Sequence, residues 1–283
     1  MLTTVNAGPY TVRGISVGGV YTSIAIPELG VVFDAGASPR SSGGLDTILL
    51  SHGHADHVGA LPALLGIRAL HGKLKPPRVV MPAEIVDDLT TALAALSRLQ
   101  RFPLEIDAIG MSPGDTIALR GDLHVRAVRT FHPVPSLGYI LVRRVAKLRA
   151  EFVGMPGPEI AKRRRAGEDV TDFEERAEVA YATDTLVSAL DHAPELLRAK
   201  VLIVECTFLD ERKTLEAARA GCHIHLDEII ERADRFRNEH VVLMHVSQLY
   251  RPDEVAALLD RRVPAPLRKR IIPFVPSGPH WPG

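Results

Sequence analysis

Apolar positions in the first half of this chain occur in short runs, most of them with the alternation of a half-buried β-strand. β-branched and aromatic residues fill these runs, and glycine and proline turns separate them. Two longer stretches, 58–70 and 82–99, carry apolar residues at helical spacing and predict amphipathic helices. The predicted strands cover residues 10–17, 21–26, 30–36, 46–50, 78–81, 104–109, 116–119 and 122–129.

The second half repeats this make-up, with strands first and helices after. The run at 201–204, V-L-I-V, is apolar throughout and predicts a central strand covered on both faces. Two stacked sheets with helices outside would bury both halves, so we expect an α/β fold, an αβ/βα sandwich, as a single domain over residues 1–283. Further strands are predicted at 138–142, 178–183, 200–205 and 240–244, and helices at 213–220, 226–237 and 252–260.

Residues 143–175 interrupt this pattern and are too long for an ordinary connection between strands. The segment holds eight basic residues between Arg143 and Arg165, and a Gly-Met-Pro-Gly-Pro stretch from Gly154 to Pro158. One interpretation is a solvated surface insertion. The other is a projecting basic arm, at about 145–175, that binds a polyanion through its phosphates.

Composition changes this picture little. Hydrophobic residues make up 46% and charged residues 24% of the chain, and basic and acidic residues number 34 each, so net charge indicates no particular partner. No run of 18 or more apolar residues occurs, and the N-terminal residues lack a basic region followed by an apolar stretch, so we expect neither a membrane span nor a secretory signal. Cys206 and Cys222 form no metal-type or disulfide pattern, which favours the reducing cytoplasm.

The stretch S-H-G-H-A-D-H, from Ser51 to His57, directly follows the apolar strand at 46–50. In extended backbone His52 and His54 point to the same side, while Asp56 and His57 follow in the turn to the next helix. Imidazole with carboxylate suits zinc, and manganese or iron fits the same ligand types. The spacing therefore predicts a site for two adjacent divalent cations.

Three further residues stand where an apolar strand ends, which is where functional side chains gather in such folds. They are His132, Asp184 and His245, and the carboxylate of Asp184 can bridge two cations. We expect them to complete both ligand sets.

With these residues the chain resembles the metallo-β-lactamase superfamily, through F-D-A-G at 33–36, the histidine cluster, His132, Asp184 and His245. Within it, the chain is similar to the short form of ribonuclease Z, the endonuclease that processes the 3′ end of tRNA. The similar segments, in order, are F-H-P-V-P-S-L-G-Y at 131–139, Y-A-T-D-T at 181–185, E-C-T-F-L-D-E at 205–211 and G-C-H-I-H-L-D-E-I at 221–229.

The resemblance implies a role for each of these residues. His52, His54 and His132 would hold one zinc ion, Asp56, His57 and His245 the other, and Asp184 would bridge them. Asp56 would also act in catalysis, and His223 would be the general acid. His225 is the alternative acid, and Asp227 or Glu205 would orient the catalytic imidazole. The implied substrate contacts are Ser136, Tyr139, Arg163, Arg164 and Arg165.

The same resemblance implies two zinc ions per subunit, precursor tRNA as substrate, a 3′-hydroxyl product and a homodimer. One departure is Leu249, which stands where the family usually has an arginine that suits a phosphate contact. Two rival functions keep the site but change its use. One is a hydrolase of small phosphodiesters or other esters, and the other is a nucleic-acid-binding module with a structural zinc site.

Overall fold

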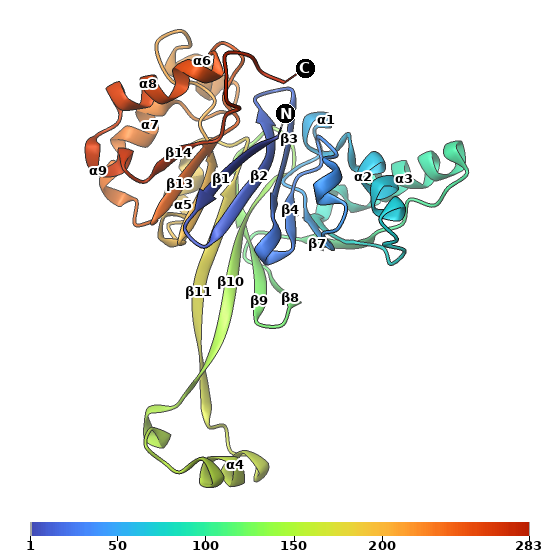
Figure 1. Ribbon diagram of the computed structural model, residues 1–283, viewed down its shortest axis with the longest axis vertical. Coiled ribbons are helices and arrows are strands. Elements are labelled where there is room, and N and C mark those ends of the chain that lie inside the picture. Colours follow the sequence, from blue (N-terminus) through green and yellow to red (C-terminus); the bar gives the residue numbers. More distant parts are fainter. Residues whose placement is uncertain (1, 283) are drawn as a thin grey trace.

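The computed structural model describes residues 2–282 and shows two stacked β-sheets with helices on their outer faces (Figure 1). Within the described residues each sheet has seven strands. This arrangement confirms the predicted αβ/βα sandwich. In spatial order the first sheet contains β1 (Thr3–Ala7), β2 (Tyr10–Val17), β3 (Tyr21–Ile26), β4 (Val31–Phe33), β5 (Thr47–Leu49), β6 (Arg78–Pro82) and β7 (Asp107–Met111). The second contains β14 (Ile271–Pro273), β13 (His240–Met244), β12 (Val201–Glu205), β11 (Thr171–Ala182), β10 (Leu137–Leu148), β9 (Leu123–Arg129) and β8 (Thr116–Arg120).

Strand β12 shows why its sequence is apolar throughout. Val201 and Ile203 belong to the core between the sheets, whereas Leu202 and Val204 pack in a second core under the outer helices. Successive side chains of a strand point to opposite faces, so a strand covered on both sides needs apolar residues at every position. Across the inner core, the rings of Phe33 and Tyr181 stack with centroids 4.4 Å apart and join the two sheets. We propose that this shared core makes the chain a single domain.

The helices divide between the two outer faces. Those on the first sheet are α1 (Ala55–Val58), α2 (Leu61–Leu70) and α3 (Val86–Gln100), and those on the second are α5 (Ser188–His192), α6 (Leu215–Ala220), α7 (Leu226–Glu231), α8 (Pro252–Arg262) and α9 (Ala265–Arg268). The helix predicted at 58–70 is wrong in extent, because the chain forms α1 inside the histidine cluster and starts again at Leu61. The helix predicted to reach residue 237 ends at Glu231, because Arg232 leaves the helical conformation and a 3-10 turn follows at Ala233–Arg235. No helix within residues 2–282 is both long and apolar enough to cross a membrane.

Residues 143–175 form an arm that projects away from the two sheets (Figure 1). Its stem is an antiparallel ribbon in which β10 and β11 run on as partners as far as Leu148 and Thr171, and its tip carries α4 (Gly157–Arg165). The predicted strand ends at residues 142 and 178 are therefore wrong. Beyond the sheets both faces of the ribbon meet solvent, so the apolar alternation that marks a strand disappears although the backbone pairing continues. Phe152 and Val170 form a small buried contact region at the tip.

A hydrogen bond to a buried carboxylate joins the two sheets, and an ion pair accompanies it. Glu178 on β11 is 5% exposed and accepts hydrogen bonds from the Tyr10 hydroxyl and the Lys200 ammonium, both at 2.8 Å. Burial alone would raise the pKa of Glu178, but these two donors hold the pKa below its ordinary value. The carboxylate is therefore ionised at neutral pH, and its Oε2 accepts both hydrogen bonds.

Candidate metal centre

The candidate site lies where the C-terminal ends of strands from both sheets meet. Three residues that follow strands β4, β11 and β13 have a left-handed backbone conformation. Their φ angles are 57° at Asp34, 46° at Asp184 and 59° at His245. This conformation is costly for residues other than glycine and persists where the surrounding structure holds it. The sharp turn at each strand end directs the side chain toward the shared edge.

The histidine-rich loop after β5 packs directly on the end of β4. The amide of Ala35 donates to the carbonyl of His57 at 2.6 Å. A Cβ at Gly36 would lie only 1.6 Å from the backbone oxygen of Asp56, so no larger residue fits here. The loop that carries the predicted ligands is thus held by backbone contacts as well as by side chains.

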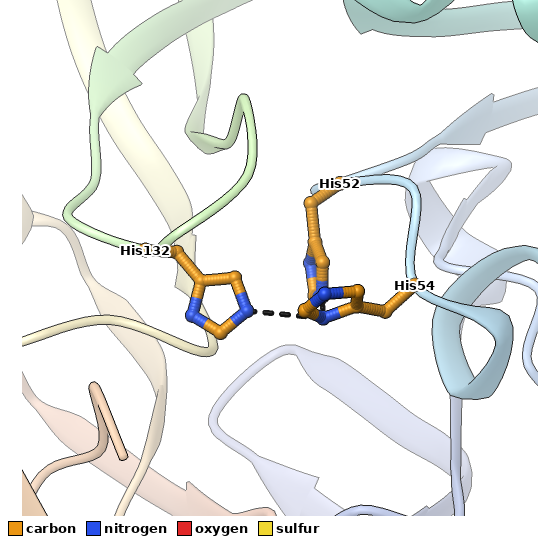
Figure 2. Close-up of side chains that lie close together, drawn as sticks. All are labelled: His52, His54 and His132. Carbon is orange, nitrogen blue, oxygen red and sulfur yellow. Dashed lines mark hydrogen bonds between the residues drawn. The ribbon is translucent and has the colours of Figure 1, made fainter. Parts of the chain in front are cut away.

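The first group of predicted ligands consists of His52, His54 and His132 (Figure 2). Nδ1 of His54 lies 3.1 Å from Nε2 of His52 and 3.1 Å from Nε2 of His132. Burial, followed by charge repulsion among the histidines, lowers the pKa of His52 to about 2 and that of His132 to about 4. Both imidazoles are therefore neutral at physiological pH, which is the form that binds a metal.

The second group consists of Asp56, His57, Asp184 and His245. Oδ1 of Asp184 lies 3.2 Å from Nε2 of His245 and 3.4 Å from Nε2 of His57, and Oδ2 of Asp56 lies 3.5 Å from the same nitrogen of His57. The other oxygen of Asp184 faces Nε2 of His52 at 3.8 Å. Asp184 thus reaches both groups, as a bridging carboxylate must.

The donor atoms fit a pair of divalent cations. Nε2 of His57 and Nε2 of His245 are buried, and neither has a hydrogen-bond partner among the described residues. Two ligands that each lie ~2.05 Å from a tetrahedral zinc ion are separated by ~3.3 Å, and the five separations given above within the two groups are 3.1 to 3.5 Å. Asp34 and Asp184 hold the pKa of His57 well above its ordinary value against the effect of burial, so cation binding there must displace a proton.

Asp34 orients this second group and was not predicted as a site residue. Its carboxylate accepts hydrogen bonds from the Ser51 amide at 2.6 Å, the Ser51 hydroxyl at 2.9 Å, Nδ1 of His57 at 2.8 Å and the Tyr181 hydroxyl at 2.6 Å. A carboxylate on Nδ1 leaves Nε2 of His57 free to face the cation position. The signal in the sequence was the one used for His132, Asp184 and His245, a polar residue directly after an apolar strand.

A second buried carboxylate, Glu205 at the end of β12, contacts His223. Nδ1 of His223 lies 3.2 Å from Oε2 of Glu205, and this oxygen also accepts from the Thr207 hydroxyl at 2.7 Å. Nδ1 of His245 in turn lies 3.1 Å from that hydroxyl. Burial opposes protonation of His223, but the charges of Glu205, Asp184 and Asp56 raise its pKa to about 9.

The two alternative acids occupy different surroundings. The ring of His223 lies 5.3 Å from that of His245 and 6.3 Å from that of His132, and its side chain is 20% exposed. His225 is buried and caps helix α7, where its Nδ1 accepts from the amide of Asp227 at 3.2 Å and its Nε2 contacts the carbonyl of Asp210. The geometry therefore favours His223, with Glu205 rather than Asp227 as its partner.

Comparisons with known proteins agree with this geometry. The family described as Beta-lactamase superfamily domain matches residues 31–246. Over 264 residues the chain is 34% identical to tRNase Z TRZ1 of Arabidopsis thaliana. The aligned region covers 93% of this chain and 94% of that protein. This chain belongs to the tRNase Z family. It is also 36% identical over 248 residues to the chloroplastic tRNase Z TRZ2 of the same plant, covering 87% of this chain and 70% of that protein.

Among solved structures, the short form of human tRNase Z has the same fold. It aligns with a TM-score of 0.56 at 18% identity and covers 88% of this chain and 93% of that chain. The predicted resemblance to the ribonuclease Z family and the predicted sandwich are thus both confirmed.

The substrate contacts implied for a tRNase Z family member lie in three different places. Tyr139 is fully buried and donates its hydroxyl to the carbonyl of Leu50 at 2.6 Å, so its predicted role as a substrate contact is wrong. It lies on β10, and its side chain faces the core between the sheets. Ser136 is half-buried, pairs with His52 in a β-bridge and contacts the Thr130 hydroxyl at 2.7 Å.

The arm arginines lie on α4 at the tip of the arm, whereas α1, which contains Asp56 and His57, lies on the body of the protein (Figure 1). Arg163 forms an ion pair with Glu168 at 3.2 Å, whereas Arg164 and Arg165 are exposed. Leu249 is 51% exposed, and the nearby Arg251 pairs with Asp253 on the start of α8. Position 249 therefore carries no charge, and the charge of the nearby Arg251 is paired with Asp253.

Proposed function

We propose that this protein is a zinc-dependent endoribonuclease that removes the 3′ trailer from precursor tRNA and leaves a 3′-hydroxyl. The observation that carries the proposal is His223, a histidine with raised pKa that lies beside both histidine groups without belonging to either. A protonated imidazole in that place can donate a proton to a leaving oxygen, which a purely structural zinc site does not require. The relatives named tRNase Z supply the substrate class.

The two ligand groups would hold one zinc ion each. His52, His54 and His132 form the first group, and Asp56, His57 and His245 form the second, with Asp184 between them. When bound, two such ions provide Lewis acidity at the phosphorus and offset the charge that develops during the attack. The ligand types also accept manganese or iron.

The remaining steps belong to the side chains. Asp56 is 20% exposed, so its carboxylate can accept a proton from the attacking water and orient that water toward the phosphorus. His223 then donates its proton to the departing 3′-oxygen of the ribose. Glu205 fixes the ring orientation and keeps the proton on the imidazole before the attack.

A basic arm and an exposed apolar surface support the proposed partners. Arg164 and Arg165 on the exposed face of α4 would contact tRNA phosphates. Leu70 and Leu74 at the end of α2 are each 86% exposed, a surface that suits association of two subunits. We propose a homodimer in which the arm of one subunit reaches the tRNA bound by the other.

Cys206 and Cys222 are free thiols, which suits the reducing cytoplasm that we propose as the compartment.

The central experiment compares two substrates on the zinc-loaded protein. One is a precursor tRNA with a 3′ trailer, and the other is a small bis-aryl phosphodiester. Cleavage at the trailer junction with a 3′-hydroxyl product is the expected result. Hydrolysis of the small ester alone would instead identify a small-molecule phosphodiesterase.

The variant Asp56→Ala tests the proposed proton acceptor. Loss of a general base lowers rates by ~10²–10⁴-fold, so we expect turnover of both substrates to fall by at least this factor while the circular dichroism spectrum stays unchanged. Removal of zinc by a chelator should abolish both activities, and added zinc should restore them. Full turnover by the variant would exclude Asp56 from catalysis.

Deletion of the arm tip separates RNA binding from chemistry. The amide of Arg149 donates to the carbonyl of Val170 at 3.0 Å, so residues 150–169 can be replaced by an Asn-Gly turn that closes the ribbon. We expect KM for the precursor to rise while hydrolysis of the small ester continues. A parallel loss of both activities would mean that the arm supports folding.

A further inference from the structure

A cavity of about 420 Å³ adjoins the first histidine group at His132. The end of β9, the following loop and the 3-10 turn after β6 form its walls, and His132 is part of its lining. His223, Glu205 and His245 are not part of the lining. His132 is thus the residue that the cavity shares with the first histidine group.

Arg129 contributes a positive charge to the lining of this cavity. Within residues 2–282 its guanidinium has neither a hydrogen-bond acceptor nor a carboxylate partner. Arginines on the same sheet are paired, as Arg126 and Arg144 are with Glu175 and Arg143 is with Asp122. The guanidinium lies 5.5 Å from the ring centroid of Phe131, which holds the side chain without neutralising its charge. Its N–H donors are thus available to an anion.

The other walls suit the remaining parts of a nucleotide. Pro113, Pro133, Val134 and Pro135 form an apolar surface on which the face of a base can pack. Glu84 also lines the cavity and makes no ion pair with Arg129, so its carboxylate can accept a hydrogen bond from a ribose hydroxyl or a base amino group. An inorganic anion would use only the arginine.

We propose that this cavity binds the first nucleotide of the trailer and that Arg129 contacts the phosphate on the 3′ side of that nucleotide. This inference rests on the proposed function. The 3′-oxygen that leaves belongs to the mature tRNA and would lie beside His223, which is not part of the cavity lining. The phosphate stays on the trailer, so the first trailer nucleotide is the part of the substrate that can enter the cavity beside His132. Arg129 precedes His132 by three residues, which limits their Cα separation to ~10 Å and suits the span of one nucleotide.

The test uses two precursors that differ in one phosphate. One has a four-nucleotide trailer, and the other has a one-nucleotide trailer that ends in a hydroxyl and so lacks the phosphate in question. We expect the wild-type protein to cleave the longer trailer with a kcat/KM about tenfold higher, which is the lower range for a hydrogen bond to a charged group. In Arg129→Ala this ratio should fall to about one, and the slope of log KM against log salt for the longer trailer should decrease by about one.

Two further variants serve as comparisons. Arg129→Lys keeps the charge but not the planar fork and should restore part of the preference. Arg261→Ala removes an exposed, unpaired arginine from the far end of α8 and should keep the wild-type ratio. Because each ratio comes from one preparation, a partly unfolded variant lowers both rates alike and leaves the ratio unchanged.

The possible failures are distinct. If the wild-type protein cleaves neither precursor, the proposed function is wrong. If it cleaves both with equal efficiency, or if Arg129→Ala keeps the preference for the longer trailer, the proposed function stands and the trailer subsite is wrong.

Discussion

The substitution Asp34→Asn should weaken metal binding although Asp34 belongs to neither ligand group. Oδ2 of Asp34 accepts three hydrogen bonds, from His57, Ser51 and Tyr181, and Oδ1 accepts one from the Ser51 amide. An asparagine has a single acceptor oxygen. If the asparagine oxygen takes the place of Oδ2 and keeps its three hydrogen bonds, the amide nitrogen takes the place of Oδ1. It then faces the Ser51 amide across a 2.6 Å contact, so two donors oppose each other.

The magnitude follows from these contacts. Loss of the buried bond to Ser51 costs about 1–3 kcal/mol of folding free energy. At His57 a neutral amide replaces the carboxylate on Nδ1, and loss of such a partner typically lowers metal affinity by about 10–100-fold. This corresponds to about 1.4–2.8 kcal/mol of binding free energy. We therefore expect a lower unfolding temperature of the metal-free protein and, separately, a higher zinc dissociation constant.

The assay is a zinc titration of metal-free protein against a competing chelator, with thermal unfolding in parallel. Asp107→Asn is a suitable control, because it makes the same chemical change in an exposed ion pair with Arg78. Wild-type zinc affinity in Asp34→Asn would refute the reasoning, since Nε2 of His57 would then be oriented without the carboxylate.

Three further outcomes follow from the same structure. Glu205→Gln removes the charge that raises the pKa of His223 to about 9, so the alkaline fall of kcat/KM for precursor cleavage should move to lower pH, and an unmoved limb would exclude this pairing. The pKa of Glu178 is lowered in the folded protein, so its ionised carboxylate stabilises the fold above the unfolded pKa, and this stability is lost as pH falls through the folded pKa. In urea unfolding, the stability advantage of wild type over Glu178→Gln should therefore shrink in acid. A pH-independent difference would contradict this. Gly36→Ala would place a methyl group 1.6 Å from the Asp56 carbonyl, and we expect a loss of about 3 kcal/mol or more in unfolding free energy, whereas an unchanged value would show that the loop can move.

Much of the fold could be predicted because its local signals agree with its tertiary environment. Strand β12 is apolar at every position because both of its faces are covered, and helices α3 and α8 have one apolar face each. The prediction failed where the surroundings change along one element. The stem of the arm pairs as a ribbon in solvent, so its polar sequence gives no strand signal.

The sequence by itself determined the residue types of the site and their places at strand ends, and the order of its motifs indicated the family. Only the tertiary structure decided which of these side chains meet. Local spacing does not distinguish His223 from His225, because the choice depends on where helix α7 begins relative to Glu205. Tyr139 and Asp34 show the same limit, since one is turned into the core and the other supports His57 through contacts between distant strands. Side-chain direction at a strand end follows from sheet register and backbone φ, and both are set by packing across the two sheets.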